Sequence, residues 1–327
     1  MFTKSLLTIL VAALVLLCGQ FSAQADLTGR IAFTSLRNGN ADIFSIDVYG
    51  SNLTRLTNDI GDDKCPVFSP DGLKIAFYSN RSGTGRLYVM DWDGNNITVV
   101  PNSQSDTSNQ VGRWIAWSPD GQKLLYRPTY DSLATIDLDG SNKTVLATGG
   151  ALGHNFIEGV EWGPTSNDIY LGAHPFSNGY NQHVFKYTIS DGVFTQITQE
   201  TEPLLSYPPQ VSTVLSRLVF GRNEGWQGPY NIYTMDLDGG NVTKLTFDTA
   251  YLNTCPDWMD DGRWITFTRG TLGGPGEIGI MDATGGNLRI FDLEGDNGTP
   301  SWTPMPEPAT LALLALGGLA VLHRRRR

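Results

Sequence analysis

The sequence predicts an all-β fold, a six-bladed β-propeller of four-stranded blades. The chain contains repeated segments in which the turn residues recur in a fixed order. The first of these copies lacks its first strand, and one additional strand-like segment follows the last complete copy. An apolar or aromatic position also recurs six times, at spacings of 49, 45, 49, 47 and 44 residues, which is the length of a propeller blade. The recurring positions are Phe68, Trp117, Trp162, Val211, Trp258 and Trp302.

Each copy contains four short strands in the same order. The first strand ends at the recurring position and turns at Ser-Pro-Asp-Gly, where proline fixes φ and glycine takes the left-handed conformation. The second is an apolar run such as Lys74 to Tyr78, and the third, as in Leu87 to Met90, alternates before an Asp-x-Asp-Gly turn. The fourth is a short segment such as Thr243 to Thr246. Four-stranded units repeated around an axis form a propeller and protect its sheet edges.

The two ends of the repeat region predict how the ring closes. The mature chain opens on "GRIAFTS" from Gly29, which is a second strand, and the last copy is complete by Glu294. Thr299 to Trp302 then supplies one further first strand. We expect this C-terminal strand to complete the N-terminal blade.

The N-terminus has the pattern of a secretory signal peptide. An apolar run from Leu6 to Leu17 follows one lysine and precedes the small-residue motif Ala23-Gln24-Ala25. Cleavage is expected between Ala25 and Asp26, after passage through the Sec machinery. Lipidation at Cys18 is the alternative, although Leu17 stands where a small residue is expected.

The C-terminus combines three features in a fixed order: Pro306-Glu307-Pro308, an apolar run from Ala309 to Leu322, and an arginine cluster of Arg324, Arg325, Arg326 and Arg327. The 14-residue run covers about 21 Å as a helix, which is short for a hydrocarbon core of about 30 Å. Together the three features resemble the PEP-CTERM sorting signal of Gram-negative bacteria. The resemblance implies an exosortase as a processing partner and only transient membrane insertion, with a plain C-terminal anchor as the alternative.

The repeat itself, P-x-[WF]-S-P-D-G followed by D-x-D-G and L-T, resembles the TolB-type WD-like propeller repeat. The resemblance spans about residues 28–304 and is most specific at Phe68–Phe77 and Trp117–Tyr126. TolB has an additional N-terminal α/β domain that engages partners, and no such domain fits between Asp26 and Arg30. We therefore do not expect TolB's role in envelope integrity here. The predicted domains are a signal peptide (1–25), the propeller (26–304) and the sorting signal (305–327).

Charge excludes one class of partner. The formal net charge is −10, and removal of Lys4 and the four terminal arginines leaves 18 basic against 33 acidic residues, a net charge of about −15. Nucleic-acid binding needs a basic surface, so no nucleic-acid partner is predicted.

Several conspicuous residues have a structural interpretation. Cys65 and Cys255 occupy the same position in the two blades that flank the first blade, so we expect them to lie too far apart for a disulfide.

The Asp-x-Asp-Gly segments lack the acidic last ligand of a calcium loop, so we interpret them as hairpin turns. The six N-x-S/T sequons, four of them at these turns, are interpreted as repeat chemistry; they lie at Asn52, Asn80, Asn96, Asn142, Asn241 and Asn297.

Arginine recurs at the end of the second strand, where pairing with acids such as Asp62, Asp63 or Asp296 would hold the following loop. A ring of arginines that grips an anionic ligand is the alternative. The series is Arg37, Arg81, Arg127, Arg222 and Arg269.

The fourth blade carries the candidate ligand site. His154, His174 and His183 are all expected at one end of that blade, on the face that also bears Tyr180, Trp226 and Tyr230 from long loops. Aromatic and histidine side chains on such loops indicate recognition of a ligand. Three histidines could hold a metal, as in propeller lyases that act on pectic fragments. No carboxylate stands at ligand spacing, so no metal site is assigned and no cofactor is predicted.

No G-x-S-x-G, Cys/His pair or paired-carboxylate motif occurs, so the sequence offers no catalytic residues for nucleophilic hydrolysis. The predicted function is a non-enzymatic exported propeller, a protein- or glycan-binding scaffold. We expect it in the periplasm, at the cell surface or in the extracellular matrix of a Gram-negative bacterium. The alternatives are a metal-assisted lyase or hydrolase that acts on acidic oligosaccharides through the blade-four histidines, and a structural surface protein with no specific ligand.

Overall fold

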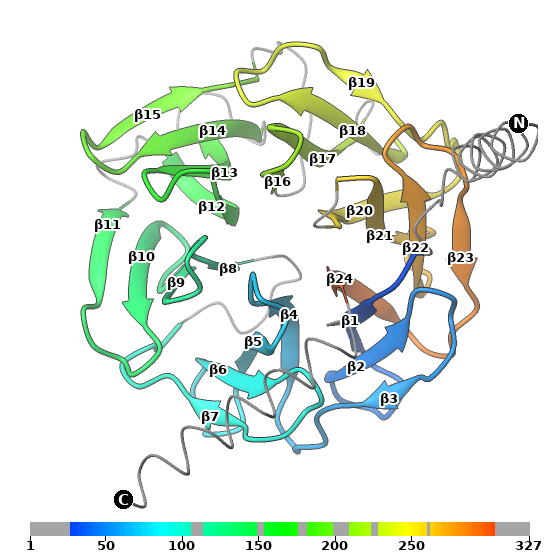
Figure 1. The fold of residues 1–327 in the computed structure, drawn as a ribbon, viewed down its shortest axis with the longest axis horizontal. Helices are drawn as coiled ribbons and strands as arrows, with labels where there is room; N and C mark the ends of the chain where they lie inside the picture. The colour runs from blue at the N-terminus through cyan, green and yellow to red at the C-terminus, as the bar shows by residue number, and fades with distance from the viewer. Residues whose placement is uncertain are drawn as a thin grey trace, which may run out of the picture.

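Six four-stranded antiparallel sheets surround a central axis in the computed structural model of the chain (Figure 1). The predicted fold class and blade number are therefore confirmed. The structure describes residues 27–105, 114–148, 154–175, 182–198, 209–223, 228–259 and 262–304.

We label the blades A to F in chain order and give the strands of each from the axis outward. Blades A, B and C comprise β24 (Asn297–Thr303), β1 (Arg30–Ser35), β2 (Asp42–Asp47) and β3 (Thr54–Arg55); β4 (Asp63–Phe68), β5 (Lys74–Ser79), β6 (Arg86–Asp91) and β7 (Thr98–Val99); and β8 (Ile115–Trp117), β9 (Lys123–Tyr126), β10 (Ser132–Asp137) and β11 (Thr144–Thr148). Blades D, E and F comprise β12 (His154–Trp162), β13 (Asp168–Pro175), β14 (His183–Thr188) and β15 (Val193–Gln196); β16 (Gln210–Ser212), β17 (Arg217–Asn223), β18 (Tyr230–Asp236) and β19 (Thr243–Lys244); and β20 (Leu252–Trp258), β21 (Trp264–Gly270), β22 (Gly276–Asp282) and β23 (Arg289–Phe291).

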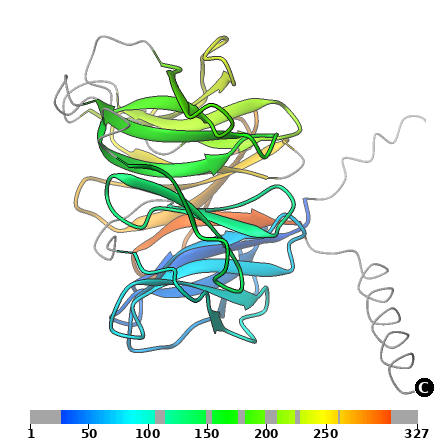
Figure 2. The ribbon, with the colours of Figure 1, turned by 90° about the vertical axis from the view of Figure 1, so that its left-hand side faces the viewer.

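The disc has two faces that differ in their connections (Figure 2). In blade A, Arg30 pairs with both Asp47 and Thr303, so the second strand begins where the first and third strands end. We call this side the turn face, because the tight turns after the first strand (such as 69–72) and after the third strand (such as 91–95) lie on it. The opposite side, the loop face, carries the connections between the second and third strands and those between blades.

The Ser-Pro-Asp-Gly turn is held by the hydrogen bonds that its residue types supply. The Ser69 hydroxyl donates to the Asp71 carboxylate at 2.6 Å and accepts from the backbone N–H of Lys74 at 2.9 Å. Gly72 has φ +70°, a conformation that favours glycine. Residues 118–123 repeat the same contacts in blade C, so the motif encodes the local geometry directly.

The turns after the third strands explain most of the sequons. In blade B, Asn96 has φ +54° and its amide donates to the Asp91 carboxylate at 2.6 Å. Asparagine tolerates this left-handed conformation and caps the turn. Four further blades repeat the asparagine–aspartate contact at Asn52, Asn142, Asn241 and Asn287, which agrees with the turn interpretation.

Acid is expected to weaken these turns. Hydrogen bonds from Asn96 and Lys74 lower the pKa of Asp91, and hydrogen bonds from Ser118 and the Gln122 N–H lower the pKa of Asp120. A carboxylate whose pKa is lowered by folding stabilises the fold above its unfolded pKa of about 3.9, and this stabilisation is lost as pH falls through the folded pKa. Urea unfolding should therefore give a constant free energy between neutrality and about pH 5 and a decline below about pH 4. An unchanged free energy at pH 3 in the wild type, or a decline no smaller in Asp91→Asn, would contradict this account.

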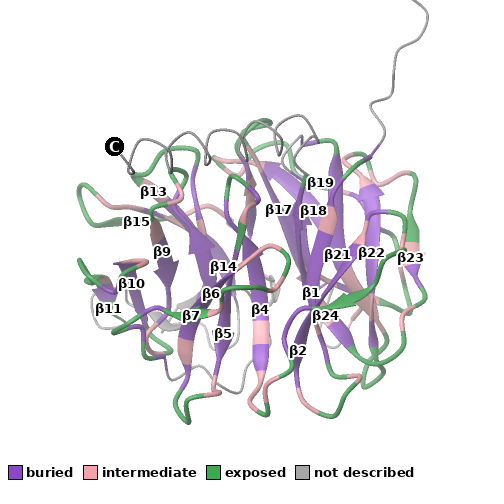
Figure 3. Cartoon of the chain, turned by 60° about the horizontal axis from the view of Figure 1, so that its bottom comes forward, coloured by how far each residue is buried: buried purple, intermediate pink, exposed green. Residues whose placement is uncertain are grey.

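The recurring aromatic residue is a wedge between neighbouring blades. Trp117 of blade C packs with Tyr78 and Leu87 of blade B, and its indole Nε1 donates to the Val67 carbonyl at 3.0 Å. Trp302 of blade A packs in the same way against Met259 and Trp264 of blade F. The strands are largely buried while the connections are exposed (Figure 3). The period of the sequence therefore reflects the packing of each blade on the blade before it.

A bulge in the first strand recurs in three blades. Cys65, Cys255 and Thr299 have φ between +48° and +57°, each precedes a proline, and the strand register shifts at each of them. A bulge bends the strand and increases its twist. Both cysteines are buried as thiols, and blade A separates their two blades.

The first blade is closed by the last strand, as predicted. Trp302 of β24 pairs with Ile31 of β1. On one side Ser301 accepts a hydrogen bond from the Phe68 N–H at 3.2 Å, and on the other the Trp302 N–H donates to Asp257 at 3.3 Å. Strand β24 thus joins blades F, A and B.

Candidate functional site

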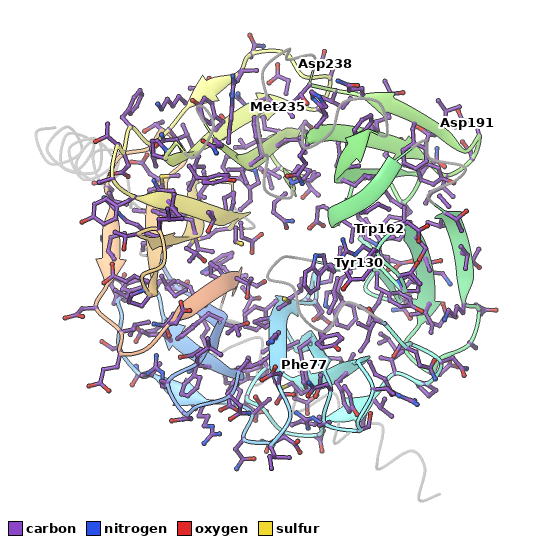
Figure 4. All side chains as sticks on the ribbon, turned by 180° about the vertical axis from the view of Figure 1, so that it is seen from behind. Phe77, Tyr130, Trp162, Asp191, Met235 and Asp238 are labelled. Carbon is purple, nitrogen blue, oxygen red and sulfur yellow. The ribbon has the colours of Figure 1, made fainter. Side chains whose placement is uncertain are left out.

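A cavity of about 460 Å³, which we call the funnel, lies at the axis on the turn face. Residues from the first strands of all six blades, and from the turns that follow them, line it. Trp162, near the axis in Figure 4, is one of the five lining aromatic residues, the others being Phe68, Trp117, Trp258 and Trp302. Their rings pack mainly between blades, and each is at most 7% exposed. The funnel therefore has a rigid wall.

Four of the polar side chains in the funnel come from the position just before a wedge residue. Asp257 and Ser301 accept the two inter-blade hydrogen bonds described above, and Glu161 accepts one from the Trp162 N–H at 3.1 Å. Gln210 holds the same position in blade E. The side chains of Glu161, Asp257 and Ser301 cap N–H groups of the innermost strands, whereas the Gln210 amide donates to the Pro209 carbonyl at 3.0 Å. The sequence analysis missed them, although alignment of the copies puts a polar residue directly before the wedge in four of the six.

The charged side chains that line the funnel are acidic. Its residues in the described part of the chain include Glu161 and Asp257 but no lysine, arginine or histidine. Asp257 is only 9% exposed. Burial in a low-dielectric wall strengthens the electrostatic effect of a charge on a ligand. The funnel therefore favours neutral or cationic groups over anionic ones.

The loop face brings the backbone positions of the three histidines together at one end of blade D, as predicted. His154 pairs with Pro175, Phe156 with His174, and Ala173 with His183. The His183 ring is 4% exposed, with Nδ1 3.3 Å from the Thr198 hydroxyl. Within the described ranges no three His, Cys, Asp or Glu side chains are grouped so as to hold a metal ion.

The predicted aromatic residues of this face are only partly placed. Tyr230 begins β18 and is half-buried, and its carbonyl accepts a hydrogen bond from Asn253 at 3.2 Å. Tyr180 and Trp226 lie outside the described residues. A ligand site made by these residues and the histidines stays a prediction.

The recurrent arginines stabilise the loop face. Arg81 donates to the buried Asp63 carboxylate at 2.7 Å and to Ser79 at 3.0 Å, and it lies 5.4 Å from the centroid of Phe77. Arg269 contacts Asp248 at 2.8 Å. The predicted partner Asp63 is confirmed.

The other two predicted acidic partners are wrong. Asp62 pairs with Lys64 at 2.9 Å, and Asp296 accepts from the Gly276 N–H at 2.7 Å. Arg37 donates instead to the Asn297 side chain at 3.0 Å. The reason is local, because Lys64 lies two residues from Asp62 and an asparagine follows Asp296 at the start of β24.

Comparison with known proteins agrees with this architecture. A family model described as the TolB beta propeller domain matches residues 20–167, and one described as the PEP-CTERM protein-sorting motif matches residues 306–327. The chain is thus a β-propeller whose first half matches the TolB propeller family and whose C-terminus matches the PEP-CTERM sorting motif. It is therefore an exported protein associated with the cell envelope.

The relatives of this propeller share only part of its length or its sequence. The Tol-Pal system protein TolB of Desulfosudis oleivorans is 35% identical over 77 residues, which are 24% of this chain and 17% of that protein. The propeller chain thus spans less than a fifth of the length of the TolB relatives it matches.

Solved structures show a likeness of fold alone. TolB from Acinetobacter baumannii matches 85% of this chain and 67% of its own, with a TM-score of 0.70 and 17% identity. An oligogalacturonate lyase in complex with manganese matches 80% of this chain and 73% of its own, with a TM-score of 0.50 and 17% identity.

The processing residues lie outside the described part of the chain; they are Ala25, Asp26, Pro306, Glu307, Pro308 and Arg324 to Arg327. The described residues contain no helix with the length and apolar character needed to cross a membrane. Cleavage at either end and transient membrane insertion stay predictions.

Proposed function

We propose that this propeller is a non-enzymatic binding scaffold and that the funnel is its ligand site. The single observation that carries the proposal is the funnel itself, a rigid cavity of about 460 Å³ built from all six blades. Ligand pockets are typically about 300–1,000 Å³ and combine apolar walls with a few placed polar groups. A peptide segment or part of a glycan chain fits such a site.

The charge of the funnel restricts the chemical classes of ligand that it can bind. Glu161 and Asp257 disfavour anionic groups and favour protonated amines or guanidinium groups, while Gln210, Ser212 and Ser301 offer neutral hydrogen bonds. The ligand we propose is therefore a neutral or cationic segment of a protein or glycan of the envelope or extracellular matrix.

The alternative, a metal-assisted lyase or hydrolase of acidic oligosaccharides, would require the loop face of blade D, because the funnel carboxylates repel an acidic chain. The buried contact of His183 with Thr198 supports a packing role for that histidine. The binding scaffold is the function that the geometry favours.

A matched pair of bulky substitutions tests the site. Thr213 is exposed at the funnel and Thr84 is exposed on the loop face. An array of neutral, cationic and anionic glycans and peptides would be probed with the propeller and with each Thr→Trp variant. We expect retention of neutral or cationic probes, a loss of at least about tenfold in affinity, about 1.4 kcal/mol, in Thr213→Trp, and little change in Thr84→Trp. Binding of acidic oligosaccharides alone, or binding insensitive to Thr213→Trp, would contradict the proposal.

A further inference from the structure

The chain leaves the propeller at the inner rim of the funnel. Strand β24 is the innermost strand of blade A, and its residues Ser301 and Trp302 line the funnel. Thr303 pairs with Arg30 at the turn face, and its hydroxyl lies so close to Gly72 that a Cβ atom there would not fit. The described chain therefore ends beside the axis of the disc rather than at its circumference.

The connection from this rim to the apolar part of the sorting motif is short. Ala309, which begins the apolar run, is five residues beyond Pro304. A fully extended chain advances at most about 3.6 Å per residue, so the two points are no more than about 18 Å apart. Lipid headgroups occupy about 5–7 Å of that distance on each side of the hydrocarbon core. At most about 11–13 Å therefore remains between the funnel rim and the lipid surface when the apolar run is embedded.

The described turns of the turn face carry many exposed acidic side chains, which weaken its attraction to an anionic bilayer. The aspartates at the tips of its turns are exposed, among them Asp191 and Asp238, which lie toward the outer rim of the disc in Figure 4. Lys74 and Lys123 on this face are paired with Asp91 and Asp137. Anionic lipids attract basic segments and not acidic ones. The short tether alone would hold this face at the membrane.

We propose that the membrane covers the funnel for as long as the apolar run of the sorting motif is embedded, and that the funnel opens when this tail is cut or extracted. The loop face stays accessible throughout. The proposal rests on the proposed function of the funnel as a ligand site, so ligand binding would be confined to the processed protein. The bilayer acts as the cover because the tether begins at the axis and is too short to reach around the disc.

The rate of reaction with a bulky thiol reagent tests this directly. Thr213→Cys places a thiol at the funnel and Thr84→Cys places one on the loop face, while the native Cys65 and Cys255 are 2% and 4% exposed. The mature chain with its tail would be embedded in vesicles of phosphatidylethanolamine and phosphatidylglycerol and treated with a polyethylene-glycol maleimide. We expect the funnel cysteine to react about tenfold more slowly than the loop-face cysteine in vesicles and at a similar rate in detergent.

A variant with a longer tether is the control for distance. About 20 Gly and Ser residues inserted after Pro304 span about 25 Å on average and should restore the reaction of the funnel cysteine in vesicles. Equal rates for the two cysteines in vesicles without the insertion would overturn the proposal, and so would protection that persists with it. The measurement uses no ligand of the funnel, so its failure is distinct from a failure of the proposed binding function.

Discussion

A chain that ends at Pro300 is expected to lose cooperative folding, whereas a chain that ends at Pro304 is expected to fold normally. The shorter chain lacks Trp302, which is 6% exposed between blades A and F, and Ser301, which accepts the Phe68 N–H. Removal of a buried tryptophan side chain alone costs about 3–5 kcal/mol, and a domain has only about 5–15 kcal/mol of stability. Loss of residues 301–303 also exposes the edge of β1 from Arg30 to Ala32.

Urea unfolding followed by circular dichroism would compare the two chains with Trp302→Ala and Trp302→Phe in the longer one. Trp302→Ala should lose about 3–5 kcal/mol and Trp302→Phe less, because a phenyl ring retains part of the wedge. Equal unfolding midpoints for the chains ending at Pro300 and Pro304 would show that closure of the ring is not needed for stability.

Asp63→Ala is expected to have the second largest effect, a loss of about 3–5 kcal/mol in the free energy of unfolding. The Asp63 side chain is fully buried, and its carboxylate lies 2.7 Å from a guanidinium nitrogen of Arg81. The Arg81 side chain is 16% exposed. Truncation leaves the guanidinium charge without its buried partner. The Phe77 and Tyr88 rings, with centroids 5.4 and 5.0 Å from the guanidinium carbon of Arg81, limit the access of water to it.

The exposed pair of Lys74 and Asp91 is the matched control, with side chains 47% and 31% exposed. Lys74→Ala should cost less than about 1 kcal/mol, because solvent screens exposed ion pairs. Combining Asp63→Ala with Arg81→Met should recover part of the loss, since both charges are then absent. A cost for Asp63→Ala no larger than that for Lys74→Ala would contradict a buried ion pair.

The fold was predictable because its periodic signals are local. Ser69 and Gly72 specify their turn through contacts within six residues, and the wedge position repeats because every blade packs on the one before it. Copies with altered turns kept the period, as at Val211, so the number of blades could still be counted. Closure of the ring followed from one strand missing at the start and one in excess at the end.

The candidate site was less predictable because it depends on contacts between blades. The hydrogen bond from Trp302 to Asp257 joins residues 45 positions apart, and the register that brings them together is not visible in either segment. The histidines are rare in the chain and therefore conspicuous in the sequence, and their backbone positions do meet at one end of blade D. The funnel is built from residue types that are common throughout the chain, so it is not conspicuous in the sequence. The left-handed backbone conformation of Cys65, which precedes a proline, could not be predicted from the sequence of one repeat.

The closing strand has a consequence for the order in which the protein matures. Blade A needs β1 from the beginning of the propeller and β24 from its end, so the ring cannot be completed until almost the whole chain has crossed the inner membrane. Residues 297–303 lie just before the sorting motif, so the strand that closes the ring is among the last parts of the propeller to be exported. A chain whose translocation stalls earlier would present an open ring, with the β1 edge unpaired and ready to be recognised by the proteases of the envelope.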